Sequence, residues 1–206
     1  MSTTRTKTQR NSKISQGVPA DMAGTPVARH SRQDLLREGL ALLAEGGIDG
    51  LTIDALCSRL KVTKGSFYHH FGGRQDFLRS LLEHWADQWT RARMVEADKG
   101  TTPRQRFENI MRESSALPSE TETSIRAWAA RDSMANAFQA QVDRQRIQYL
   151  ESIFLDVTGD TARSRLLARI DYSLFVGARA IAPPFDNEER LAMFDMLSKE
   201  LYRFPA

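Results

Sequence analysis

The chain has 206 residues, 41% of them hydrophobic, which is enough for one or two domains with a buried core. A single cysteine excludes an intrachain disulfide framework. Because no apolar run approaches ~18 residues and no signal-peptide core begins the chain, we expect a cytoplasmic protein without a membrane span. The formal net charge of +3 is small, so any contact with nucleic acid must come from local clusters of basic residues.

Residues 1–30 form the first segment and have no apolar periodicity. They are rich in Ser, Thr, Gln, Gly and Pro, and against the single acid Asp21 they carry the basic residues Arg5, Lys7, Arg10, Lys13 and Arg29. This composition predicts a disordered basic tail. Two interpretations stay open: an arm that adds phosphate affinity or reaches a minor groove, and a plain solvated extension or misplaced start codon.

The first helix is predicted to begin after Ser31, which with Asp34 forms a suitable N-cap pair. One face of this helix is apolar and carries Leu35, Leu36, Leu40, Leu43 and Ala44. Glycines at 46 and 47 then end it. This helix supplies an apolar face against which shorter helices can pack.

A short helix is predicted next, with Thr52 as its N-cap. Leu56 and Leu60 lie four residues apart and so share its buried face. The pattern breaks at residues 61–62, where the chain must turn.

A second short helix begins after Thr63, its predicted N-cap. Phe67 and Phe71 repeat at the same spacing of four, with Tyr68 beside them, and residues 72–73 are both glycine. Each of the two helices is too short to be stable alone, so both must be held by a third. Two short helices joined by a sharp turn indicate a helix-turn-helix.

The same residues resemble a known family. The run VTKGSFYHHF at 62–71, followed by RQDFL at 74–78, is similar to the signature of the TetR family of bacterial transcriptional regulators. The segment LALLAEGGIDGLT at 40–52 resembles the first helix and loop of that family. The strong resemblance covers residues 32–80, about a quarter of the chain.

Two positions depart from the family pattern. Cys57 stands where alanine is usual, and we expect it to be a packed small hydrophobic residue rather than a redox sensor. Lys61 stands in the turn where glycine is common. If Lys61 adopts a left-handed conformation, the cost relative to glycine is about 1 kcal/mol, and its charge would lie near a phosphate.

The polar face of the second short helix carries phosphate and base-edge donors rather than catalytic groups. The resemblance implies that this helix lies in the major groove of an operator. Within it we expect Lys64, Ser66, His69 and His70 to contact DNA, with Gly65 allowing close approach and Tyr68 donating to a phosphate. The residues that anchor the DNA backbone around the turn are then Thr52, Lys61 and Thr63.

A longer helix is predicted from residue 74 to about 93. Its apolar face begins against the helix-turn-helix and continues beyond it through Phe77, Leu78, Leu81, Leu82, Trp85 and Trp89. Such a helix can connect two domains. We therefore divide the chain into a DNA-binding domain at 31–76 and a regulatory and dimerisation domain at 77–206, joined by the helix at 74–93. His84 on this helix is expected to be a surface or satisfied histidine.

The rest of the chain predicts a helical body. A linker at 98–103 ends in Thr102 and Pro103, an N-cap and a first-turn proline. Helices are expected at 103–117, 121–131, 133–157, 160–181 and 187–203, with Asp160 and Asp186 as caps and Glu189 completing a capping box. No strand pattern is present, so the expected fold is all-α: an N-terminal three-helix helix-turn-helix domain followed by a C-terminal helical domain.

The last two helices carry apolar stripes at spacings of three and four. From the residues alone, an intrachain core and a seam between two copies are equally good explanations. The resemblance implies a homodimer with a four-helix bundle, because a helix-turn-helix head normally reads two half-sites through two-fold symmetry. The expected interface residues are Leu167, Ile170, Leu174, Gly177, Ile181, Leu191, Phe194 and Leu201.

The body also contains many aromatic and methionine side chains, which are either core or the lining of a pocket for a small apolar or aromatic effector. The resemblance favours an effector pocket in this domain. The candidates for its lining are Phe107, Met111, Trp128, Phe138, Tyr149, Tyr172 and Phe175.

Catalysis is not expected, and neither a metal nor a cofactor is predicted. Neighbouring histidines at 69 and 70 point about 100° apart and cannot bind one metal together, and the sequence has no phosphate loop, nucleophile elbow or H-E-x-x-H motif. The resemblance to the TetR family implies a homodimeric repressor that leaves a double-stranded DNA operator when a small effector binds. The alternative is an effector-independent structural DNA-binding dimer or protein-interaction module, which a filled internal cavity or a co-purified ligand would argue against.

Overall fold

The computed structural model describes residues 1, 30–116, 118–202 and 204 of the chain. Within these residues the secondary structure is helical throughout, as the sequence predicts. The elements are α1 (Arg32–Gly50), α2 (Ile53–Leu60), α3 (Lys64–His70), α4 (Arg74–Ala86), the π-helical turn η1 (Asp87–Arg91), α5 (Ala92–Ala97), α6 (Pro103–Ser115), α7 (Ser119–Ala129), α8 (Ser133–Thr158), α9 (Thr161–Ala180), α10 (Asn187–Leu197) and the π-helical turn η2 (Ser198–Tyr202). The predicted tail lies almost wholly outside the described residues.

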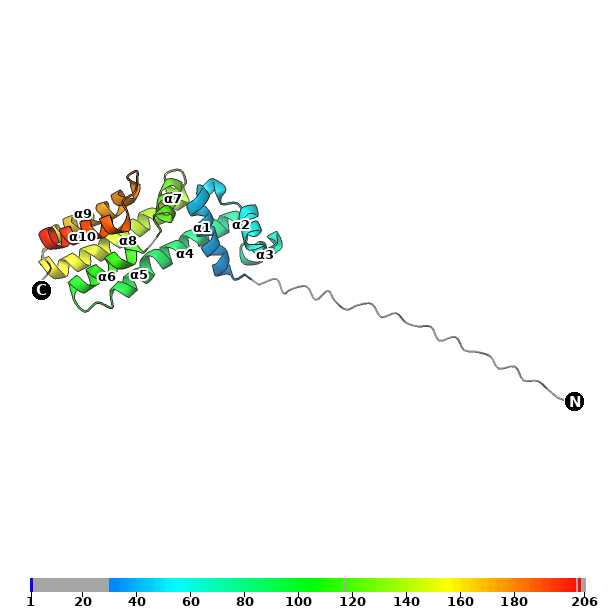
Figure 1. The fold of residues 1–206 in the computed structure, drawn as a ribbon, viewed down its shortest axis with the longest axis horizontal. Helices are drawn as coiled ribbons and strands as arrows, with labels where there is room; N and C mark the ends of the chain where they lie inside the picture. The colour runs from blue at the N-terminus through cyan, green and yellow to red at the C-terminus, as the bar shows by residue number, and fades with distance from the viewer. Residues whose placement is uncertain (2–29, 117, 203, 205–206) are drawn as a thin grey trace.

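Helices α1–α3 form a head at one end of the molecule, α5–α10 form a body at the other, and α4 runs between them (Figure 1). The predicted caps of the head are confirmed. The side chain of Ser31 accepts from the backbone N–H of Asp34 in a capping box, and Thr52 and Thr63 accept from the third residue of α2 and α3. Local hydrogen bonding at each start therefore fixes where the three helices begin.

The turn between α2 and α3 contains Lys61 in the left-handed region, at φ 55° and ψ 40°. The N–H groups of Lys61 and Val62 donate to the carbonyls of Ser58 and Cys57, which satisfies the end of α2. Cys57 itself is buried, and burial raises the pKa of its thiol, as suits a packed side chain.

The first helix differs from its prediction at its end. It kinks at Gly47, which has a φ of 63°, but the chain resumes a helical course as far as Gly50. Gly47 thus bends the helix instead of ending it, since only glycine adopts this conformation without strain.

The connecting helix also differs from its prediction. It runs past residue 93 to Ala97, and five residues of it form the π turn η1. Its first part belongs to the head, where Phe77 and Leu81 touch the α1 backbone at Gly39; a Cβ on that glycine would lie 2.7 Å from Phe77. Trp85 is fully buried in the same cluster, together with Ile125 of α7.

The core has two parts, both made of side chains from several helices. One cluster joins α1–α4 to α7 and the start of α8, so that α7 packs against α1. The other fills the far end of the body and is built on α6, α8, α9 and α10. The predicted caps Thr102, Asp160 and Asp186 hold the body helices, the last in a capping box with Glu189. No helix among the described residues is long and apolar enough to cross a membrane.

Candidate nucleic-acid interface and interior cavity

Aromatic packing fixes the orientation of α3. Phe67 is fully buried and Phe71 almost so, and both rings pack edge-on against Phe77 of α4, with centroids 5.4 and 5.1 Å apart. The opposite side of α3 is therefore left to solvent. Tyr68 lies there with 55% of its surface exposed.

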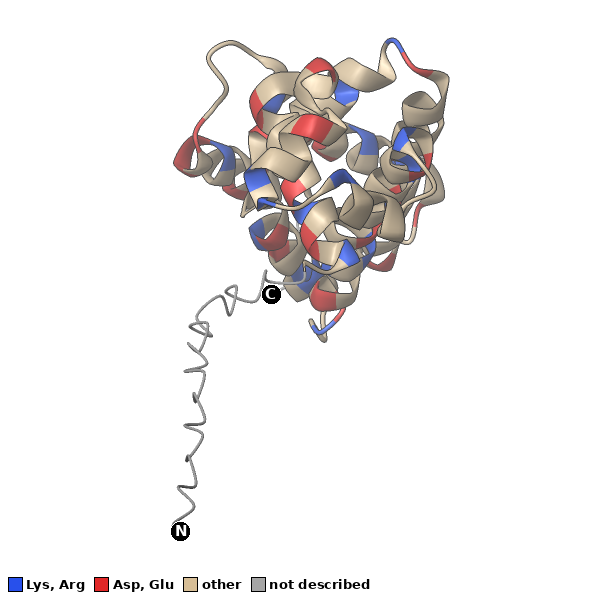
Figure 2. Cartoon of the chain, turned by 90° about the vertical axis from the view of Figure 1, so that its right-hand side faces the viewer, with Lys and Arg blue, Asp and Glu red and all other residues tan. Residues whose placement is uncertain are grey.

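The candidate DNA contacts all lie in the head, around the turn between α2 and α3. Two of them, Ser66 and His70, are half-buried. The others are exposed: Thr52, Lys61, Thr63, Lys64, Gly65, Tyr68 and His69. Figure 2 looks toward this end of the molecule and shows basic and acidic residues interspersed, in line with the small net charge.

Lys64 is paired within the free chain. Its Nζ lies 2.6 Å from Oδ1 of Asp54 on α2, and this hydrogen bond raises the pKa of the lysine. Both side chains are exposed, and exposed pairs contribute little to stability. Lys64 can therefore exchange Asp54 for a phosphate at small cost.

An interior cavity lies in the body between η1, α5, α6, α8 and α9. Its volume is about 40 Å³, space for roughly three water molecules. Four of the predicted pocket residues line it: Met111, Tyr149, Tyr172 and Phe175. The remaining wall residues are Trp89, Thr90, Arg93, Met94, Ile110, Ser114, Arg146, Leu150 and Asp171.

Three predicted pocket residues do not reach the cavity. Phe107 packs with Phe154 and Tyr202 at the far end of the body. Trp128 and Phe138 belong to the cluster shared with the head. These aromatic side chains are core, the alternative that the sequence left open.

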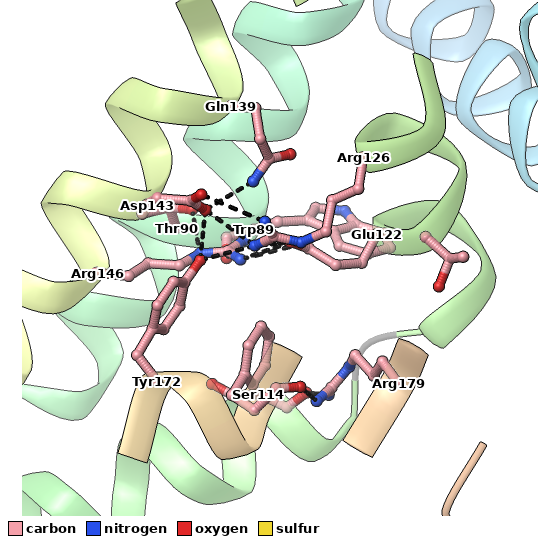
Figure 3. Close-up of polar contacts among 12 residues, drawn as sticks. Trp89, Thr90, Ser114, Glu122, Arg126, Gln139, Asp143, Arg146, Tyr172 and Arg179 are labelled. Carbon is pink, nitrogen blue, oxygen red and sulfur yellow. Dashed lines mark hydrogen bonds and ion pairs between the residues drawn. The ribbon is translucent and has the colours of Figure 1, made fainter. Parts of the chain in front are cut away.

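Beside the cavity lies a network of buried charges from α7 and α8 (Figure 3). Nη1 of Arg146 donates to both carboxylate oxygens of Glu122 at 3.1 Å, and its Nε donates to the hydroxyl of Thr90 at 3.1 Å. Nη2 of Arg126 lies 3.0 Å from Glu122 and 2.9 Å from Asp143. Two arginines thus compensate two carboxylates in the interior.

Tyr172 and Gln139 complete this network by donating to Asp143 at 2.6 and 2.7 Å. Burial alone lowers the pKa of Arg126, but its hydrogen bond to Asp143 and the charge of Glu122 raise it above the usual range. For Asp143, burial raises the pKa, and the hydrogen bonds from Arg126 and Tyr172 outweigh that effect and lower it. Arg126 and Asp143 are therefore both ionised at neutral pH.

The sequence did not predict the charged network beside the cavity or Asp171 on its wall. Glu122 and Arg126 are four residues apart, and Asp143 and Arg146 are three apart, spacings that usually mark exposed helix pairs. Nothing local distinguishes a buried pair from an exposed one. The single residue Asp171, buried without a cation beside it, gave no signal at all.

The structure divides the predicted dimer residues into three groups. Leu167 and Phe194 are buried in the core of the chain itself, because they point from α9 and α10 into the body. Three are half-buried: Leu174, Gly177 and Leu201. Ile170, Ile181 and Leu191 are between 41% and 49% exposed. The exposed edge of the stripe is thus free to meet a second copy.

Comparison with known proteins gives matches that agree with this arrangement. Residues 35–81 match the family described as "Bacterial regulatory proteins, tetR family". The chain is 37% identical over 68 residues to the transcriptional regulator AcuR of Cereibacter sphaeroides, covering 33% of this chain and 31% of AcuR. It is 32% identical over 89 residues to the HTH-type transcriptional repressor DhaR of a Mycobacterium species, covering 43% of each chain. The matched segments span less than half of either relative.

The fold match extends over most of the chain. The solved structure of a TetR-family transcriptional regulator from Streptomyces coelicolor superposes with a TM-score of 0.70 at 18% identity, covering 84% of this chain and 94% of that one. That regulator shares with this chain a helix-turn-helix head on a larger helical body. Within the head, residues 35–81 are similar to the TetR family. Members of this family bind DNA, act as dimers and are not enzymes.

Proposed function

We propose that the chain acts as a homodimer that binds a DNA operator through α3 of each copy and releases it when a small molecule occupies the cavity. One observation carries this proposal: the cavity wall includes η1, a turn of the same helix whose first part, α4, packs under α3. A ligand in the cavity therefore acts directly on the element that holds the DNA-reading helix. The similarity to the repressor DhaR supports repression as the sign of regulation.

DNA recognition would use the exposed side of α3. A helix fits the major groove, and its polar side chains can donate to phosphates and base edges. Lys64 exchanges Asp54 for a phosphate, while His69 and Ser66 face the bases. Two such heads would read half-sites one helical turn apart, ~34 Å.

Dimerisation would use the last two helices. Single exposed apolar side chains are normal on a protein surface. Here, however, five of the nine large hydrophobic side chains exposed in the described part of the chain belong to this region: Leu166, Ile170, Ile181, Leu191 and Met196. Their concentration supports a seam between two copies.

Coupling between the cavity and the head would pass through one helical stretch. Trp85 is locked in the core shared with the head, and Trp89, one turn later, lines the cavity. Thr90 beside it accepts from Arg146, which ties η1 to α8. Because the cavity has space for only about three waters, any larger ligand must push these walls apart.

An entry route supports the same mechanism. Trp89 and Arg93 line the cavity and also an open hollow between α1, α4 and α7, so that these two side chains lie between the cavity and the hollow. A ligand entering between them would displace η1 on its way in.

A cavity-filling substitution tests this proposal without knowledge of the effector. After an operator is selected from random duplexes, we expect Met111→Trp to mimic the ligand by pushing on η1 and to weaken operator binding roughly 5- to 150-fold, the usual range of allosteric coupling. Phe107→Trp is the matched control, because it overfills the body core away from η1. Fluorescence anisotropy measures the affinity, and sedimentation confirms that both variants remain dimers.

The other outcomes are equally informative. Operator affinity unchanged in Met111→Trp would favour the effector-independent structural dimer. Tighter binding would indicate a co-repressor. Failure to select any operator would refute the assignment of α3 as a DNA-reading helix.

A further inference from the structure

Asp171 on α9 is a fully buried carboxyl group on the cavity wall. Its Oδ1 accepts from the hydroxyl of Tyr202 at 2.8 Å, whereas its Oδ2 has no hydrogen-bond partner in the described part of the chain. Buried polar atoms are nearly always hydrogen-bonded, because an unpaired one costs free energy. We propose that the effector is a compact amine whose protonated nitrogen donates to Oδ2 of Asp171 while its apolar part lies against the rest of the cavity wall.

The charge arrangement around the cavity supports a cationic ligand. Arg146 is committed to Glu122 by two hydrogen bonds, and Arg93 is paired with Glu113 at 2.6 Å. Asp171 makes no ion pair with any described residue of the chain. A cationic ligand would form the ion pair that Asp171 lacks. An anionic ligand would instead bring its own negative charge close to the carboxylate of Asp171.

Arg179 is the other buried charge near this wall, and it serves a different purpose. Its guanidinium donates to the carbonyls of Ser114 and Phe175 and lies 3.9 Å from the centroid of the Phe175 ring. It thus closes the end of α6 and has no ion pair with Asp171.

The protonation of Asp171 agrees with this assignment. Burial raises its pKa to about 7, although the hydrogen bond from Tyr202 opposes the rise. A bound ammonium would favour the charged carboxylate and reverse part of this effect. Tyr202 acts as a positioning residue, since it fixes one carboxylate oxygen and leaves the other without a partner in the described part of the chain.

The rest of the wall selects the apolar part of the ligand. The hydrophobic side chains of the wall are Met94, Ile110, Met111, Leu150 and Phe175. They give the apolar part of the ligand a surface to pack against. With only about 40 Å³ of free volume before the walls move, the ligand must be small, with one ring or a short alkyl group.

This inference deepens the proposed function and rests on it, because it assigns a chemistry to the same effector. Four probes of similar shape separate the possibilities by calorimetry on the full-length dimer: benzylamine, benzyl alcohol, benzoate and toluene, with butylamine as a smaller amine. We expect benzylamine to bind more tightly than the alcohol or toluene by roughly 10- to 100-fold, and benzoate not to bind.

Asp171→Asn removes the charge but keeps an oxygen that accepts from Tyr202. We expect this variant to lose roughly 10- to 100-fold in benzylamine affinity while its affinity for toluene is unchanged. Asp195→Asn, the same change on the exposed face of α10, is the matched control. A crystal structure of the wild-type complex needs no variant and must place the amine nitrogen within hydrogen-bond distance of Oδ2.

Several results would overturn the inference: no binding by either amine, equal affinity for benzylamine and toluene, an Asp171→Asn variant with unchanged amine affinity, or a nitrogen placed elsewhere. Operator affinity measured with each probe separates this failure from failure of the proposed function. If toluene releases the operator from wild type and Asp171→Asn alike, the effector response stands and the amine assignment fails. If benzylamine binds at Asp171 and operator affinity does not change, the site stands and the proposed induction fails.

Discussion

The buried carboxyl of Asp171 should make the stability of the protein depend on pH in an unusual direction. Burial raises the pKa of Asp171 from 3.8 to about 7, so the folded state binds the proton more tightly than the unfolded state does. The stabilising effect of that proton is complete below about pH 4 and is lost as the pH rises through 7. A shift of about three units at ~1.4 kcal/mol each corresponds to about 4 kcal/mol, as an upper estimate.

The assay compares wild type with Asp171→Asn, which does not titrate. Other carboxyl groups act in the opposite direction: hydrogen bonds from Ser31, for example, lower the pKa of Asp34 to about 2. Subtracting the variant from wild type cancels these common contributions. We then measure urea unfolding at a fixed protein concentration between pH 4 and 8. The difference in unfolding free energy between wild type and Asp171→Asn should fall by up to about 4 kcal/mol, with most of the loss between pH 5 and 7.

A difference that stays constant within about 1 kcal/mol over this range would refute the reasoning, because it would mean that Asp171 ionises like an exposed carboxyl. A difference that grows with pH would indicate a cation beside Asp171 in the folded protein, contrary to its surroundings in this structure.

Two further substitutions test the head and the dimer seam. If Lys64 contacts a phosphate, Lys64→Ala should weaken binding to all DNA sequences alike and lower the salt dependence of log K by about 1. If Lys64 contacts a base, the same variant should lose about 1–3 kcal/mol of binding free energy at one base position, and a DNA titration across salt concentrations distinguishes the two outcomes. The control is Lys99→Ala, which should have no effect although Lys99 is also exposed and paired with an acid. Ile170→Asp should give a monomer in sedimentation, since an unpaired charge is costly in an apolar seam. Val95→Asp, on the exposed face of α5, is the control and should leave the oligomeric state unchanged. A dimeric Ile170→Asp variant would place the interface elsewhere.

Local signals in the sequence were sufficient to predict the head. Ser31, Thr52 and Thr63 cap their helices through hydrogen bonds to residues three positions away, and Phe67 and Phe71 repeat at the spacing of one helical turn. Such information is contained within a few residues, so periodicity and capping rules recover it.

The cavity could not be predicted in the same way, because its wall comes from five helices. Phe107 and Met111 lie one turn apart on α6 and read alike in the sequence, yet only Met111 lines the cavity while Phe107 packs with Phe154 and Tyr202. Which buried side chain borders a void depends on how the helices are arranged, and no local pattern contains that.

The dimer stripe illustrates a related difficulty. Leu167 and Ile170 are three residues apart on α9 and appear on one stripe, but the first is buried in the chain's own core and the second is 45% exposed. A helix face about 100° wide includes both positions, so the pattern cannot separate the inner edge of a stripe from its outer edge.

The π turn η1 makes the angle between head and body depend on chain length. Each residue of a regular α-helix turns about 100°, so adding or removing one rotates everything beyond it. The apolar spacing along this helix is four from Trp85 to Trp89 and five from Trp89 to Met94, and the wider π turn accommodates that extra residue. Inserting or deleting one residue at this point would therefore rotate α1–α3 relative to the body.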